Sequence, residues 1–290
     1  MKGHKATALI LATPWVLTFL IFWTFPLIYS FLAGLTNYRL FTPHHFAWIG
    51  LANFKALFSD PDFLGSLKNT FIFVIGTIPI TTVVSLVMAL LVNRKFRGRG
   101  IFRAAYFLPS ITSMVVIALI FTNLYQRGGY IAMLASMLGF TPPEYGFLYN
   151  NGTALYSIMA MDIWMSAGYF MLIFLAGLKA IPDELYEAAE ISGASSWRQF
   201  TSITLPMLRP VALYVLVINA IKSFQVFVEI FVMTQGKFDT STAVYFIYEK
   251  GLTTGFEVGY ASAAAYVLFA IIAVVSLVLF TSMRRRAPLW

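Results

Sequence analysis

Residues 70–92 have the sequence TFIFVIGTIPITTVVSLVMALLV, which holds no charged side chain. A run of about 20 apolar residues is long enough to cross the hydrocarbon core of a bilayer as a helix. Five basic residues follow this run within ten positions, namely Arg94, Lys95, Arg97, Arg99 and Arg103. Short basic blocks beside an apolar run are typical of the cytoplasmic ends of membrane spans. The stretch therefore predicts a transmembrane helix.

The composition of the whole 290-residue chain agrees with this prediction. Hydrophobic residues make up 59% of it and charged residues 11%, whereas about 25% of a soluble domain is charged. So few charges cannot cover a water-soluble surface, and the high hydrophobicity excludes intrinsic disorder. The chain has no cysteine, which excludes disulfides and thiolate metal sites. Its net charge of +8 gathers at the ends of apolar runs, so no nucleic-acid partner is expected.

Six apolar stretches predict an all-α integral membrane protein with six transmembrane helices. They cover residues 8–32, 70–92, 105–125, 154–175, 211–234 and 261–283. The first is longer than the 7–15-residue apolar core of a signal peptide, so we expect an uncleaved anchor. Residues 1–290 are predicted to form a single transmembrane permease domain.

The distribution of basic residues predicts the orientation. Thirteen of the 20 Lys and Arg residues lie on the side of the membrane that holds the N-terminus, six lie on the other side, and Lys222 lies within a span. Because cytoplasmic loops carry the excess of Lys and Arg, both termini are expected in the cytoplasm. The three histidines, His4, His44 and His45, lie outside the spans, and their spacing predicts no metal site.

The segment at residues 176–208 has a helical pattern of its own. Pro182 suits the first position of a helix, and Gly193 is well placed to end it. Ser196 and Gln199 form a Ser-x-x-Gln capping box, which predicts a second short helix. The segment is therefore expected to form a helix, a glycine turn and another helix on the cytoplasmic side.

The first of these helices presents a narrow face that consists mostly of small residues, Leu185, Ala188, Ala189 and Ser192. Such a face permits the backbone of another protein to approach closely. Packing of the same face against the chain's own helices is an equal alternative.

The segment resembles the EAA loop of binding-protein-dependent ABC importer permeases. Glu187-Ala188-Ala189 is followed after three residues by Gly193, and after nine more by Ile203-Thr204-Leu205-Pro206. Resemblance to the carbohydrate-uptake branch, of the maltose and glycerol-phosphate type, extends over almost the whole chain. It includes residues 50–54, 60–61, 69–70, 97–100, 103, 107–109, 175–178, 181–182 and 259–263.

This resemblance implies the type I ABC importer permease fold and a mechanism. Two permease subunits, here a heterodimer, form the pathway, and each EAA loop inserts a coupling helix into one of two ATPase subunits that bind ATP and Mg. An extracytoplasmic solute-binding protein delivers a sugar substrate across the bacterial or archaeal cytoplasmic (inner) membrane. The residues implied in coupling to the ATPase are Glu187, Ala188, Ala189, Gly193, Leu205 and Pro206.

The chain itself is not expected to be an enzyme or to hold a cofactor. Its only Gly-Lys pair, Gly236-Lys237, lacks the upstream glycine of a Walker motif, because Phe231 occupies that place. Three positions depart from the family pattern: Ser192 stands where many members have aspartate, residues 235–238 replace a glycine- and proline-rich turn, and Glu229 follows a valine where aspartate is common. The last two weaken any transfer of substrate identity.

Charged residues inside spans cost about 2.5–3.5 kcal/mol each on insertion scales, and Asp162, Lys222 and Glu229 are such residues. On a continuous helix, Lys222 and Glu229 lie within about 20° of each other. With Asn219 and Gln225 they form a polar stripe, which is predicted to line the substrate pathway. A stabilising cluster or a contact with the second permease is an equal alternative. Asp162 is expected in an interfacial or packing role.

The leading function is therefore the transmembrane permease subunit of an ATP-driven sugar or oligosaccharide importer. A glycerol-phosphate or polyol-type ABC importer permease is the alternative, although a phosphate pathway should offer several basic groups. A stand-alone secondary carrier is disfavoured because no internal repeat is visible. An intramembrane enzyme is disfavoured because the spans lack histidine, cysteine and the hydrolase motifs.

Overall fold

The computed structural model describes residues 2–42, 47–94 and 96–284, with side chains from residue 11 to residue 282 within those ranges. Three residues named above lie outside the described residues: His44, His45 and Lys95. The side chain of His4 lies outside them as well.

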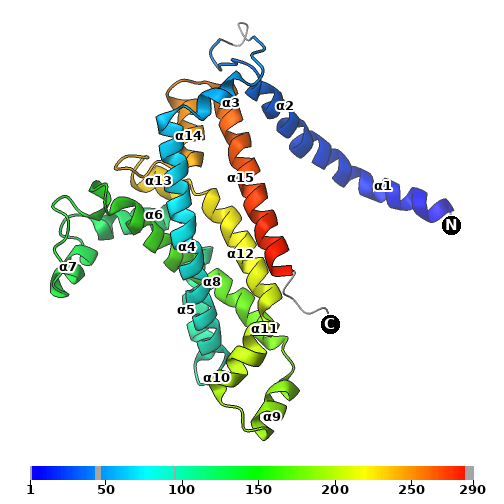
Figure 1. Cartoon of the computed structure of the whole chain (residues 1–290), viewed down its shortest axis with the longest axis vertical. Coiled ribbons are helices and arrows are strands. Elements are labelled where there is room, and N and C mark those ends of the chain that lie inside the picture. The colour runs from blue at the N-terminus through cyan, green and yellow to red at the C-terminus, as the bar shows by residue number, and fades with distance from the viewer. Residues whose placement is uncertain (1, 43–46, 95, 285–290) are drawn as a thin grey trace. The chain divides into compact units, whose positions relative to one another are not determined.

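Every regular element in the described part of the chain is a helix (Figure 1). The first half contains α1 (Lys2–Phe19), a π-helical turn (Leu20–Thr24), α2 (Phe25–Gly34), α3 (Ala52–Leu57), α4 (Pro61–Asn93), α5 (Arg99–Ile111), α6 (Met114–Tyr125), α7 (Tyr130–Met137) and a 3₁₀ turn (Phe147–Tyr149). The second half contains α8 (Ala154–Lys179), α9 (Asp183–Ile191), α10 (Ser196–Gln199), a π-helical turn (Phe200–Thr204), α11 (Leu205–Met207), α12 (Arg209–Phe224), α13 (Val228–Met233), α14 (Ala243–Tyr248), a π-helical turn (Glu249–Thr253) and α15 (Val258–Arg284).

Five helical segments of the described chain are long and apolar enough to cross a membrane: Leu11–Gly34, Pro61–Asn93, Ala154–Lys179, Arg209–Met233 and Val258–Ser282. The pair α5 and α6 makes a sixth if it counts as one bent span. Each segment overlaps one of the six predicted spans. The chain packs as two compact units, residues 1–64 with 246–270 and residues 65–245 with 271–290. That both act as one permease domain stays a prediction.

The third predicted span is not one continuous helix, which corrects the prediction for residues 105–125. Its halves, α5 and α6, meet at an angle of 96°. Thr112 and Ser113 between them have ψ angles of 150° and 127°, which lie outside the helical range. Pro109, in the last turn of α5, lacks the N–H that a continuous helix needs.

In the first unit, α2 and the beginning of α15 meet through small residues. A Cβ atom on Gly259 would lie 2.3 Å from the carbonyl oxygen of Thr36, and one on Gly34 would lie 3.3 Å from the backbone nitrogen of Ala263. The side-chain amide of Asn53 donates to the carbonyl oxygens of Gly34 and Thr36, at 2.9 and 2.8 Å. Glycine at position 259 therefore permits a contact that any side chain would block.

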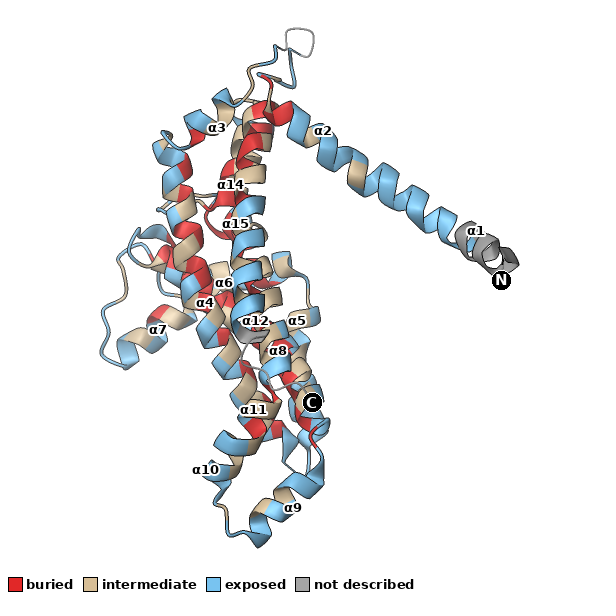
Figure 2. Ribbon diagram, turned by 45° about the vertical axis from the view of Figure 1, so that its right-hand side comes forward, coloured by how far each residue is buried: buried red, intermediate tan, exposed pale blue. Residues whose placement is uncertain are grey.

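In the second unit, α8 is the central helix (Figure 2). In its apolar stretch, 67% is buried. It packs against α5, α6, α12 and α13. A Cβ atom on Gly168 would lie 1.9 Å from the carbonyl oxygen of Tyr106, so the backbones of α8 and α5 approach closely. Phe73, Ile117 and Ile158 belong to one apolar cluster around α8, and Phe170 and Phe174 belong to another.

Candidate translocation pathway and coupling loop

An ion pair joins two of the predicted spans in the second unit. The Nζ atom of Lys222, on α12, donates to Oδ1 of Asp162, on α8, at 2.7 Å. It also donates to the hydroxyl of Ser166, which in turn donates to Oδ1 of Asp162 at 3.2 Å. The side chain of Asp162 is 2% exposed, whereas that of Lys222 is 40% exposed. The carboxylate is therefore buried with its countercharge, as a charge within a membrane protein requires.

Glu229 is a second buried carboxylate beside this pair. It is 4% exposed and lies close enough to interact electrostatically with Asp162 and with Lys222. The cluster thus contains two carboxyl groups and one ammonium group, and the charge of Lys222 is matched within the chain.

The fifth predicted span is broken in the middle, which corrects the helical geometry assumed for the polar stripe. α12 ends at Phe224 and α13 begins at Val228. Gln225, with φ −98° and ψ 16°, and Phe227, with φ −144° and ψ −55°, lie outside regular helical geometry. The Thr242 hydroxyl donates to the carbonyl oxygen of Val226 at 3.0 Å, so a backbone group freed by the break keeps a partner.

The four stripe residues consequently do not share one helical face. Asn219 is fully buried and accepts a 3.4 Å hydrogen bond from Ser223, whose hydroxyl lies 3.3 Å from that of Thr77 on α4. Its Nδ2 has no partner among the described residues. Lys222 contacts α8 instead, Gln225 is exposed at the break, and Glu229 is buried. That these residues line the substrate pathway stays a prediction.

The residues after α13 form a turn of unusual backbone geometry. Gln235, Phe238 and Asp239 have positive φ angles of 53°, 57° and 56°, a conformation that costs about 1–2 kcal/mol for a residue with a side chain. The side-chain amide of Asn69, on α4, donates to the carbonyl oxygens of Asp239 and Ser241, at 3.0 and 3.1 Å. The N-terminal part of α4 therefore holds this turn in place.

The segment at residues 176–208 contains the predicted helix, glycine turn and helix. α9 begins at Asp183, so Pro182 is its N-cap and not its first residue as predicted. Gly193 has φ +74°, and α10 begins two residues after Ala194. The predicted cap is displaced by one residue: Ser195, not Ser196, is the N-cap, and its hydroxyl accepts from the backbone nitrogen of Arg198. The Gln199 side chain donates to the carbonyl of Ala194.

Most of this segment is exposed (Figure 2). Glu187, Ala188, Gly193 and Leu205 are exposed, and Ala189 and Pro206 are half-buried. One contact that fixes α9 to the rest of the unit is the 2.8 Å hydrogen bond between the hydroxyls of Tyr186 and Thr204. Ile191 is 89% exposed and Trp197 is 72% exposed, so large apolar side chains here are available to another chain.

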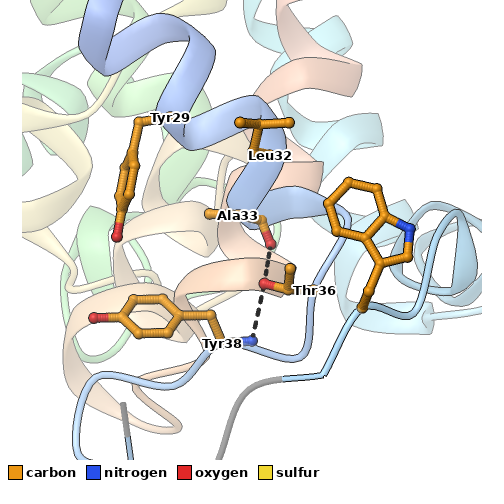
Figure 3. A pocket seen from close by; sticks show the side chains of 6 residues that line it. Tyr29, Leu32, Ala33, Thr36 and Tyr38 are labelled. Carbon is orange, nitrogen blue, oxygen red and sulfur yellow. Dashed lines mark hydrogen bonds between the residues drawn. The ribbon is translucent and has the colours of Figure 1, made fainter. Parts of the chain in front are cut away.

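A small aromatic pocket of about 220 Å³ lies in the first unit, at the end of α2 (Figure 3). Tyr29 and Tyr38 are among its lining residues. Between them, the Thr36 hydroxyl donates to the carbonyl oxygen of Ala33 at 2.8 Å and accepts from the Tyr38 nitrogen at 3.3 Å. Aromatic residues at span ends suit the membrane–water interface.

Membrane-crossing helices, a charged cluster beside a broken span and an exposed helix–glycine–helix segment together define the membrane component of a transport system. Residues 81–287 match the family described as the binding-protein-dependent transport system inner membrane component, and the chain belongs to this family. A member of this family is the membrane-spanning part of its transport system and is not itself the catalytic subunit.

Relatives cover nearly the whole chain. The arabinooligosaccharides transport system permease protein AraP of Bacillus subtilis (strain 168) is 36% identical over 282 residues, which are 95% of this chain and 88% of that protein. The lactose transport system permease protein LacF of Rhizobium radiobacter is 33% identical and covers 82% of this chain and 81% of that protein. A crystal structure of a bacterial alginate ABC transporter, in complex with an alginate pentasaccharide-bound periplasmic protein, contains a chain with a TM-score of 0.83 and 26% identity, covering 99% and 97% of the two chains.

The sequence singled out Asp162 as a charge within a span, with an interfacial or packing role, but did not reveal its partner. It assigned no role to Ser166, and none to Asn69 beyond the family pattern. Asp162 and Ser166 are four residues apart, which places them on the same face of a helix. That spacing is a signal the sequence held, but it did not reveal which helix lies opposite.

Proposed function

We propose that this chain is the permease subunit of an ATP-driven importer of neutral sugars or oligosaccharides. Membership of the binding-protein-dependent family supports import. Relatives named for arabinooligosaccharides and lactose support a sugar as the substrate. The observation that carries the preference for a neutral sugar is the pairing of Lys222 with Asp162 at 2.7 Å.

Lys222 is the only basic residue within the six predicted spans, so it is the group that an anionic substrate would need there. Asp162 already matches its charge, and Glu229 adds a further carboxyl group nearby. A phosphate or uronate would find the one ammonium group already paired and a further carboxyl group beside it, whereas a neutral sugar would need only hydrogen-bonding groups.

ATP hydrolysis is assigned to a partner. In this proposal the segment from α9 to α11 docks on one of two ATPase subunits that bind ATP and Mg, with Glu187, Ala188, Ala189, Gly193, Leu205 and Pro206 at the contact. The exposure of Ile191 and Trp197 supports a docking surface, because exposed apolar patches mark interaction sites. A second permease completes the pathway, and a solute-binding protein delivers the sugar from outside.

The proposed orientation puts both termini in the cytoplasm of a bacterial or archaeal cell. The basic cluster between α4 and α5 supports this orientation, because it lies on the same side of the spans as α9 and α10.

The test is reconstitution. The chain is co-expressed with a second permease and an ATPase encoded beside it, and ATP-dependent uptake into proteoliposomes is measured with the solute-binding protein present. The panel contains arabinooligosaccharides, lactose, trehalose, a uronate oligosaccharide and glycerol 3-phosphate. We expect uptake of a neutral sugar and none by the isolated chain. Uptake of only the anionic compounds, or gradient-driven transport by the isolated chain, would overturn the proposal.

A further inference from the structure

A groove of about 610 Å³ lies in the second unit, between the end of α4 and the segment that leads to α12. Val87 and Leu90 of α4 give it an apolar part. Trp197 and Phe200, whose rings lie 5.6 Å apart, also line it. Arg94, directly after the last residue of α4, is a further lining residue. The groove therefore combines a cationic group with apolar and aromatic side chains.

The position of the groove along the spans is set by its lining residues. α4 ends at Asn93 and α8 ends at Lys179, and both Asn93 and Leu178 line the groove. The ends of two apolar spans mark the depth at which lipid headgroups meet the acyl chains. These lining residues therefore suit headgroup depth on the side that carries the basic loop.

The charge beside the groove is not matched within the described part of the chain. Arg94, Arg97 and Arg99 are exposed, and none of them belongs to an ion pair formed among the described residues. Arg103 donates to the carbonyl oxygen of Val92 at 2.9 Å, which ties the basic loop to the end of α4. No countercharge for these three arginines lies among the described residues, and anionic lipids would supply one at this depth.

We propose that this groove binds an anionic phospholipid, with the headgroup phosphate at Arg94 and an acyl chain against Val87 and Leu90. A free phosphate would leave the apolar walls uncovered, whereas a phospholipid covers both parts. Tyr186, which fixes α9 through Thr204, also lines the groove. A bound lipid therefore braces the coupling segment and makes the rate of ATP hydrolysis depend on the composition of the membrane.

Lipid retention tests this site without reference to the transported substrate or to the proposed function. The full chain, purified with its co-expressed partners, is exchanged into nanodiscs of phosphatidylcholine with increasing phosphatidylglycerol. Tightly bound phosphatidylglycerol is then counted by native mass spectrometry. The variant is Arg94→Gln, and the matched control is Arg97→Gln, which removes an exposed arginine of the same loop that does not line the groove. We expect Arg94→Gln to bind about fivefold more weakly, the effect of losing one cation beside an anionic leaflet, and Arg97→Gln to retain the lipid.

Three results would overturn the proposal. Equal loss of bound phosphatidylglycerol from Arg94→Gln and Arg97→Gln would mean that only general surface charge is involved. Protection against thermal unfolding by inorganic phosphate alone, in detergent, would mean a free-anion site. Loss of the ATPase from Arg94→Gln in both pure phosphatidylcholine and mixed nanodiscs would mean that the groove is covered by the ATPase. A second variant, Leu90→Trp, places a larger side chain in the apolar part of the groove. It should narrow the groove and reduce lipid retention while leaving every arginine in place.

Discussion

Asp162 accepts a hydrogen bond of 2.7 Å from Lys222, sixty residues away in the sequence, although Asp162 is almost fully buried and Lys222 is not. The two residues join α8 to α12 where the fifth span is about to break. Because only Asp162 is buried, substitutions at the two positions should differ in their effect on stability.

Lys222→Met should destabilise the protein more than Asp162→Asn. Removal of Lys222 leaves a buried carboxylate without its countercharge, which costs about 3–5 kcal/mol. Removal of Asp162 leaves a lysine that is 40% exposed, so we expect about 1–2 kcal/mol. The measurement is the free energy of unfolding in mild detergent.

The double variant Asp162→Asn with Lys222→Met should recover most of the lost stability, because neither charge is then unmatched. Lys237→Met, at an exposed lysine, is the control and should change the free energy by less than about 0.5 kcal/mol. Equal effects of the two single variants would contradict the proposed role of burial.

Cysteine labelling should separate the four candidate pathway residues, because the chain has no native cysteine. In the absence of nucleotide we expect strong labelling by a water-soluble thiol reagent at Gln225, weaker labelling at Lys222, and protection at Asn219 and Glu229. Substrate or ATP should change labelling at two or more positions. Val217 is the control, and uniform protection in every state with transport intact would mean that these residues are structural.

Gly193→Leu should uncouple transport without preventing membrane insertion. No atom lies within 4 Å of a Cβ added at Gly193, whose φ is +74°, so the expected damage is to the turn and to the docking surface. We expect substrate-stimulated ATP hydrolysis to fall about tenfold, which corresponds to ~1.4 kcal/mol of docking free energy. Glu187→Lys should have a similar effect.

Gly139→Leu is the matched control for this variant. Gly139 also has a positive φ, +83°, and open space around its Cβ position, but it lies between α7 and α8 rather than in the coupling segment. Gly139→Leu should cost the same backbone strain at positive φ, and ATP hydrolysis should still be stimulated by substrate. Unimpaired transport by Gly193→Leu combined with Glu187→Lys would exclude a docking role for the segment.

Asn69→Ala should loosen the turn after α13. The variant removes the hydrogen bonds to the carbonyl oxygens of Asp239 and Ser241 and should cost about 1–3 kcal/mol. Hydrogen–deuterium exchange should increase at residues 235–241. Asn123→Ala, which removes an exposed amide bonded within its own helix, should leave exchange there unchanged, and equal exchange in both variants would show that Asn69 does not hold the turn.

Gly168→Ala should disrupt the packing of α5 against α8, because the added Cβ would lie 1.9 Å from the carbonyl oxygen of Tyr106. The helices must separate, so we expect a loss of at least about 1–3 kcal/mol. Gly100→Ala, in α5 with nothing within 4 Å, should be neutral or stabilise by up to about 1 kcal/mol. Equal unfolding midpoints for the two variants would contradict close backbone contact at Gly168.

The sequence by itself determined which segments are long and apolar enough to cross a membrane and which segment forms the helix–glycine–helix hairpin. Both follow from local signals: a span such as residues 70–92 is defined by its own apolar length, and Gly193 ends α9 because glycine accepts a positive φ. The family resemblance carried by Glu187, Ala188, Ala189 and Gly193 rests on the same local pattern.

Only the tertiary structure decided how the polar residues of the fifth span are arranged. A uniform rotation of 100° per residue predicted one stripe from Asn219 to Glu229, but the helix breaks at Gln225. Thr242, from another part of the chain, supplies a partner for the freed carbonyl of Val226. The partner of Lys222 could not be found from spacing either, since Asp162 lies on another helix. Contacts between helices depend on which faces meet, and the pattern along one helix does not contain that information.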